Sequence, residues 1–190
     1  MSAICGVIDL NFEKNGKKKS SFSLLRNMWC ASAPLGRAYA YINNGFSVCC
    51  DRQKGAFCSL PCIDAKKKGE NCTLILDSSP PFPDYTEELL TRYLHDGAEA
   101  LCELKDKASF VLLDESDNFI MISAARTPFF FSHDATDNRF FFATEEGPIL
   151  SLRDSGINIS LPSTRLSPSG IAMYCSMSAD KRSNTEDRSQ

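Results

Sequence analysis

The stretch ASFVLLDESDNFIMISAARTPFFFSHDATDNRFFFAT, residues 108–144, alternates apolar runs with short polar segments. The apolar runs span 108–114, 119–124, 127–133 and 139–144. The polar segments DESDN and DATDN join them in pairs, and this arrangement is typical of β-hairpins. The second hairpin is rich in phenylalanine, and alternate rings are expected to fill the space between two stacked sheets. The alternative is that Phe129–Phe131 and Phe140–Phe142 form an exposed patch that binds a partner.

Further strand runs lie on both sides of this stretch. They span 1–10, 38–42, 46–50, 56–60 and 72–76 upstream, and 157–159 and 171–175 downstream. The triplet Asn43-Asn44-Gly45 is a strong signal for a hairpin turn between two of the upstream runs. The run CTLIL at 72–76 is continuous rather than alternating, which predicts a strand that is buried on both faces.

Three segments have the pattern of helices. The clearest is 86–104, where leucines recur near a 3.6-residue period, and Gly97 is expected to divide it into two helices. A short helix is expected at 21–30, capped by Ser20 or Ser21, and another at 146–152. Because strands dominate, we expect an α+β fold built on antiparallel hairpins.

The composition indicates a single packed domain. The chain has 190 residues, of which 43% are apolar, and this is enough for a hydrophobic core. Lys and Arg number 21 against 24 Asp and Glu, which leaves a net charge of −3. A field this weak argues against a nucleic-acid or anionic-membrane partner. We expect one domain over 1–175 and a polar, disordered tail over 176–190.

The apolar runs and the cysteines bear on location and on metal binding. No apolar run reaches the roughly 18 residues that cross a bilayer, and the N-terminal segment lacks the basic region of a secretory signal. The nine cysteines are therefore expected to be reduced, mostly buried thiols of a cytoplasmic protein. They form no CxxC pair, and His95 and His133 are far apart, so we expect no metal and no other cofactor.

Six segments form a series along the chain that is similar to one known family. They are MSAICGVIDL (1–10), Leu24-Leu25-Arg26 with Met28, GAEALCELKDKASFVLLD (97–114), residues 124–130, Phe142-Ala143-Thr144-Glu145 and Leu166–Gly170. In this order they resemble the glutaminase domain of asparagine synthetase-type proteins, the class II glutamine amidotransferases. The first resembles the N-terminal strand of that family, and Phe142–Glu145 resembles its Phe-Ala-Ser-Glu segment.

The resemblance spans about residues 1–175 and implies a fold and partners. The fold is the four-layer αββα sandwich of the N-terminal-nucleophile hydrolases, with two antiparallel sheets face to face and helices outside. The synthetase half and its ATP-binding motifs are not seen, so the expected partner is a separate synthetase or another protein subunit. The expected small ligand is glutamine or another small amide.

In this family the nucleophile is the first residue of the mature chain, and its own α-amino group serves as the base. The family uses cysteine there, whereas this sequence has Ser2 in that register. Removal of Met1 would give Ser2 a free amine. The alternative is cleavage after Ile4, which would make Cys5 the nucleophile. We expect Cys5 to be a buried thiol instead, because a shift of three residues would turn the faces of the strand over.

The residues that would bind substrate are partly retained. The family holds the glutamine carboxylate with an arginine, and Arg52 aligns with it, although a surface arginine at a strand end is an equal alternative. The family's His-Arg-Gly-Pro-Asp-type loop is replaced here by WCASAPLG, residues 29–36. An aspartate that binds the substrate amine in the family aligns with Tyr85, and Asp84 lies one residue away, where it either compensates or caps a helix.

The oxyanion hole departs most from the family pattern. The family has an Asn-Gly turn after a buried strand, and this sequence has Asp77 and Ser78 there. An ionised Asp77 cannot donate a hydrogen bond, and the loss of one such donor costs about 10²–10³ in rate. We therefore expect a catalytically degenerate domain that acts as a binding or regulatory subunit. The alternatives are an N-terminal-serine amidohydrolase and an ammonia-supplying glutaminase subunit of a separate enzyme.

Overall fold

The structure is a computed structural model, and it describes most residues between Ile4 and Cys175. The described ranges are 4–9, 18–32, 38–43, 45–51, 55–61, 71–77, 86–102, 107–115, 119–125, 127–160, 164–166 and 170–175. The tail at 176–190, which we expect to be disordered, lies outside these ranges.

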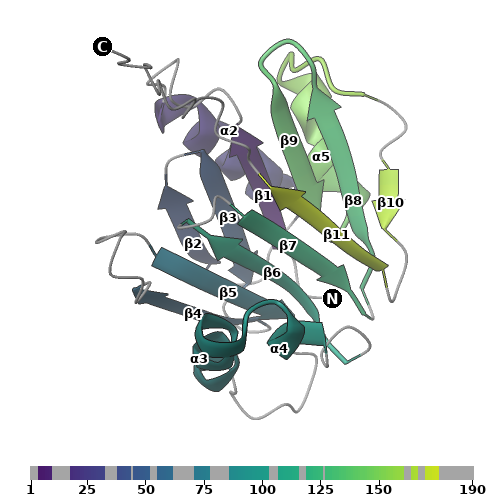
Figure 1. The fold of residues 1–190 in the computed structure, drawn as a ribbon. Coiled ribbons are helices and arrows are strands. Elements are labelled where there is room, and N and C mark those ends of the chain that lie inside the picture. Colours follow the sequence, from purple (N-terminus) through teal and green to yellow (C-terminus); the bar gives the residue numbers. More distant parts are fainter. Residues whose placement is uncertain are drawn as a thin grey trace, which may run out of the picture.

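The first of two antiparallel sheets has six strands, and the N-terminal strand lies inside it (Figure 1). In spatial order the strands are β10 (Thr164–Leu166), β8 (Phe129–Asp134), β9 (Arg139–Ala143), β1 (Ile4–Asp9), β3 (Phe46–Asp51) and β2 (Ala38–Asn43). Strands β2 and β3 form the hairpin expected at the Asn-Asn-Gly turn, where Gly45 has a φ of 87°. Because β1 pairs with β3 on one side and β9 on the other, its backbone is held from both sides.

The second sheet has five strands and follows the order of the chain more closely. In spatial order the strands are β11 (Gly170–Cys175), β7 (Phe119–Ala124), β6 (Ser109–Asp114), β5 (Asn71–Asp77) and β4 (Gly55–Pro61). Each neighbouring pair is antiparallel. The expected α+β class with two antiparallel sheets is therefore confirmed.

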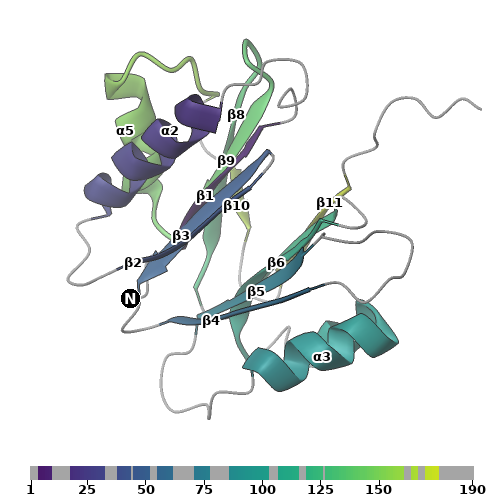
Figure 2. The same cartoon turned by 90° about the vertical axis from the view of Figure 1, so that its left-hand side faces the viewer.

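Helices cover the outer face of each sheet (Figure 2). Helices α2 (Lys18–Ala31) and α5 (Glu146–Asp154) lie on the six-stranded sheet. Helices α3 (Thr86–Asp96) and α4 (Glu99–Cys102) lie on the five-stranded sheet. The break between α3 and α4 falls at Gly97, as expected, because its φ of 74° is a conformation that glycine adopts without strain.

The apolar side chains form three clusters, one between the sheets and one under each pair of helices. Strand β5 contributes to two of them, since Ile75 faces the other sheet while Leu74 faces α3. Both side chains have no exposed surface, which confirms that this strand is buried on both faces.

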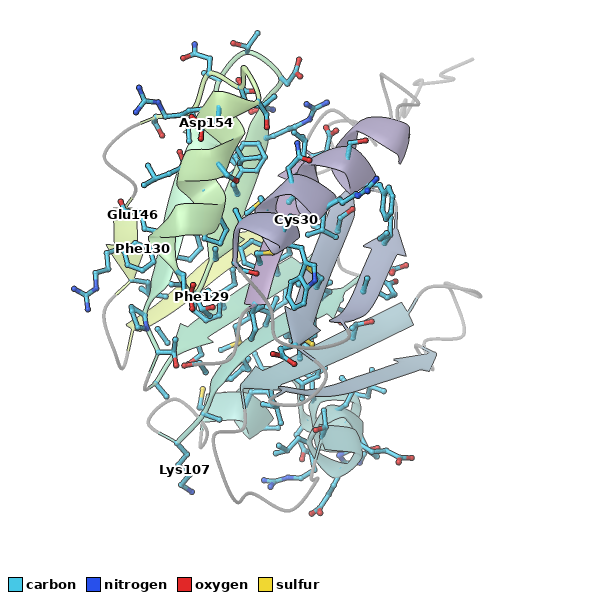
Figure 3. All side chains as sticks on the ribbon, turned by 180° about the vertical axis from the view of Figure 1, so that it is seen from behind. Cys30, Lys107, Phe129, Phe130, Glu146 and Asp154 are labelled. Atoms are coloured by element: carbon cyan, nitrogen blue, oxygen red, sulfur yellow. The ribbon has the colours of Figure 1, made fainter. Side chains whose placement is uncertain are left out.

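The phenylalanines of the β8–β9 hairpin are divided between two clusters. Phe129 and Phe142 lie between the sheets, with ring centroids 6.3 Å apart. Phe130 and Phe141 lie on the opposite face of the hairpin, toward α2 and α5. Figure 3 labels Phe129 and Phe130 on this hairpin. Phe129, Phe141 and Phe142 are buried, so the expectation of core residues is confirmed rather than that of an exposed patch.

Two expectations about the local structure are wrong. Helix α2 begins at Lys18, so neither Ser20 nor Ser21 caps it. Ser21 shares the buried helix face with Leu24, Leu25 and Met28, which its spacing from them explains.

The second wrong expectation is a strand at 157–159. Helix α5 ends there in a Schellman motif, in which the Ile157 N–H donates to the Leu152 carbonyl (3.0 Å) and the Gly156 N–H donates to the Arg153 carbonyl (2.9 Å). The apolar side chains of Ile157 and Ile159 pack with Leu152 in the cluster between the helices and the six-stranded sheet. The strand in this region is β10, which pairs with β8.

No helix in the described part of the chain is long and apolar enough to span a membrane.

Candidate functional site

Three strand ends that the sequence associates with chemistry lie at one end of the molecule. Strand β1 begins at Ile4, which pairs with Cys50 near the end of β3 at Asp51. Strand β4 begins at Gly55, which pairs with Asp77 at the end of β5. Only three residues, 52–54, connect β3 to β4, so the Cα atoms of Asp51 and Gly55 are at most about 15 Å apart. We call this region, defined by Ile4, Asp51 and Asp77, the site end.

Helix α3 also begins toward the site end. Its third turn lies at the other end of the sheet, because the Tyr93 hydroxyl donates to Asp114 Oδ2 (2.8 Å) and Asp114 pairs with Cys72. Thr86, seven residues earlier, is about 10 Å away along the helix axis. Figure 2 shows the start of α3 on the same side as the start of β4.

The predicted site residues lie at the borders of these elements. Asp77 is the last residue of β5, and its side chain is outside the described part of the structure. The others lie outside the described residues, and they are Ser2, Arg52, Ser78, Asp84 and Tyr85. Each of them lies, in the sequence, within two residues of a helix or strand that the structure describes.

Thr144 is a residue at the site end to which the sequence assigned no function. It follows the last residue of β9, and its N–H donates to the Ile4 carbonyl (2.9 Å). In return the Ile4 N–H donates to the Thr144 hydroxyl oxygen (3.0 Å). Both residues are almost completely buried. The only signal in the sequence is the likeness of Phe142–Glu145 to a family segment, which says nothing about this contact.

The second candidate nucleophile, Cys5, is inside the sheet. It is 1% exposed, faces the helices, and its Sγ lies 3.3 Å from Sγ of Cys49, its partner on β3. The hydrogen bond with Cys5 and, after it, burial raise the pKa of the Cys49 thiol, so this thiol stays neutral. Removal of the chain before Cys5 would also remove Ile4 from the core between the sheets. These contacts fit the expected role of Cys5 as a buried thiol.

Charged side chains gather at the opposite end of β1. Arg139 donates from Nε to Asp9 Oδ2 (3.2 Å) and from Nη1 to Asp137 Oδ2 (2.7 Å). Asp9 and Arg139 are cross-strand partners, and their side chains are 2% and 6% exposed. This buried pair joins the end of β1 to the start of β9, so it has a structural explanation that needs no ligand.

Among the described residues, no group of three or more His, Cys, Asp or Glu side chains is placed to hold a metal ion.

Comparison with known proteins adds no identification, since neither a family model nor a curated protein matches the chain.

Proposed function

We propose that the chain is a glutaminase-like domain of the class II glutamine amidotransferase type, with an N-terminal-nucleophile hydrolase fold, that has lost hydrolysis. In this proposal it binds glutamine or another small amide at the site end. It then acts in the cytoplasm as a regulatory or partner subunit of a separate synthetase-type enzyme or another protein.

The observation that carries the proposal is that three strand ends lie at one end of the molecule, the site end. A glutaminase of this class needs a nucleophile before its first strand, a carboxylate-binding arginine after a neighbouring strand, and oxyanion donors after a strand of the other sheet. Ser2, Arg52 and the Asp77-Ser78 pair adjoin the corresponding ends of β1, β3 and β5.

The pairing of β1 with β3 supports the same arrangement. The partners Ile4↔Cys50 and Cys5↔Cys49 belong to one antiparallel register. In the sequence, Ser2 lies two residues before Ile4, and Arg52 lies two residues after Cys50. The proposal assigns both residues to the same ligand site.

The loss of hydrolysis is argued from the chemistry of two positions. A carboxylate at Asp77 presents only acceptors, and it repels the negative charge that develops on a tetrahedral intermediate. A serine hydroxyl also lacks the thiolate fraction that makes cysteine a strong nucleophile near neutral pH. In the proposal, a site with these two changes still binds an amide, but it lacks the oxyanion donor and the strong nucleophile that cleavage needs.

The test is ammonia release from glutamine and asparagine by protein with an untagged N-terminus, together with calorimetric binding of both. We expect binding but no release above background by the wild type. Asp77→Asn restores a donor, so it should produce release that disappears when Ser2→Ala is added. Asp154→Asn, an exposed carboxamide substitution on α5, is the matched control.

Two other results would lead to different conclusions. Release by the wild type that is lost in Ser2→Ala would identify an active N-terminal-serine amidohydrolase or an ammonia-supplying subunit. Neither binding nor release, in the wild type and in Asp77→Asn, would overturn the glutaminase-like assignment.

A further inference from the structure

Ile4 makes hydrogen bonds with Thr144, and the one from its N–H to the Thr144 hydroxyl is not part of a regular β-ladder. In an antiparallel strand, the N–H and C=O of one residue point toward the same neighbour. Both groups of Ile4 point toward β9, and Thr144 binds both, through its own N–H and through its hydroxyl oxygen. Thr144 is therefore the anchor of the first described residue of β1.

The hydroxyl takes the place of a backbone acceptor because the chain leaves the sheet at this point. The regular pairing of β1 with β9 ends at Cys5↔Ala143. Glu145 is still extended, with φ −130° and ψ 152°, and α5 begins at Glu146. The backbone N–H and the hydroxyl of Thr144 together thus continue the ladder by one position beyond the end of β9. A buried Ile4 N–H without that oxygen would have lost its acceptor.

We propose that Thr144 is a positioning residue of the site end. Its hydroxyl fixes the start of β1, and thereby the place of the N-terminal residue relative to the end of β3. Ser2 is separated from Ile4 by a single residue in the sequence. This inference rests on the proposed function, because it assigns the anchor a role in ligand binding at that end.

The experiment compares Thr144→Val, which replaces the hydroxyl by a methyl group, with Thr144→Ser, which keeps it. Thr136→Val is the matched control, because Thr136 is exposed in the β8–β9 turn. The first readout is hydrogen exchange at the Ile4 amide, with the Ile8 amide of the same strand as internal reference. The second is calorimetric affinity for glutamine, measured on variants whose thermal unfolding remains cooperative.

We expect Thr144→Val to speed exchange at Ile4 by at least about tenfold without changing Ile8, and to weaken glutamine binding by at least about tenfold. Thr144→Ser should restore both values, and Thr136→Val should change neither. A merely structural role would leave the glutamine affinity of folded Thr144→Val equal to that of the wild type, and this result would overturn the proposal.

An Ile4 amide that exchanges as fast as an unprotected amide in the wild type would also overturn it. That result would overturn the proposal even if Thr144→Val does not fold. Absence of glutamine binding by the wild type would instead count against the proposed function, and the anchoring of Ile4 by Thr144 would then be judged from the exchange rates alone.

Discussion

At the scale of single residues, Gly6 shows how closely neighbouring strands β1 and β9 pack within the six-stranded sheet. It lies on the face of β1 that is turned toward the other sheet, between Ile4 and Ile8. A Cβ atom placed on Gly6 would be 2.1 Å from Cζ of Phe142, its cross-strand partner. The ring of Phe142 therefore occupies the space that any other residue at position 6 would need.

We predict that Gly6→Ala destabilises the protein by about 1–3 kcal/mol, because the buried Phe142 ring must shift. Urea unfolding measures the loss. Gly147→Ala is the control, since a Cβ there meets nothing within 4 Å beyond its chain neighbours. Its effect should be smaller than that of Gly6→Ala, because the helix preference of alanine is offset by the restriction that Pro148 places on the residue before it. Adding Phe142→Leu to Gly6→Ala should recover part of the loss. Equal effects of the two glycine substitutions would contradict the close contact.

At the scale of elements, the end of α5 explains why a strand is expected where none exists. The alternation of Ile157 and Ile159 around a polar residue is the pattern of a half-buried strand. The same spacing arises here because Ile157 makes the apolar contact of a Schellman motif with Leu152. Gly156, with a φ of 81°, is the residue that allows the chain to turn.

We predict that Gly156→Ala lowers the free energy of unfolding by about 1–2 kcal/mol, the cost of a left-handed conformation for a residue with a Cβ. Gly156→Asn should lose less, because asparagine tolerates this conformation. Thermal and urea unfolding of the two variants give the comparison. A neutral Gly156→Ala would show that α5 does not need this C-terminal cap.

At the scale of the whole molecule, the sequence predicts what depends on local periodicity. The hairpins at 108–144 and the doubly buried β5 follow from runs of neighbouring residues, and the structure has them. The contact between Ile4 and Thr144 joins residues 140 positions apart, and no local pattern contains it. Strand β10 has only three residues, too few for a period. For the proposed site, the sequence offers candidate residues next to the ends of β1, β3 and β5, while the placement of these ends at one end of the molecule depends on the pairing of distant strands.

The neutral thiol of Cys49 gives the molecule as a whole a pH dependence in the alkaline range. Its hydrogen bond with Cys5 and its burial raise its pKa in the folded state. In the unfolded chain an ordinary cysteine loses its proton at about pH 8.5. Below that pH both states hold the proton, so stability is unaffected; above it the unfolded state binds fewer protons, and the free energy of unfolding falls as pH rises.

We predict that this one thiol contributes a slope of about −1.4 kcal/mol per pH unit above about pH 8.5. Urea unfolding of the reduced protein between pH 7 and pH 10 measures the total slope. Cys49→Ala is less stable at neutral pH because of the cavity, but its alkaline slope should be shallower by about that amount. Cys30→Ala, at an exposed position on α2, should keep the slope of the wild type. If Cys49→Ala retains the full slope, the folded protein does not hold this thiol neutral, because its pKa is then the same in the folded and unfolded states.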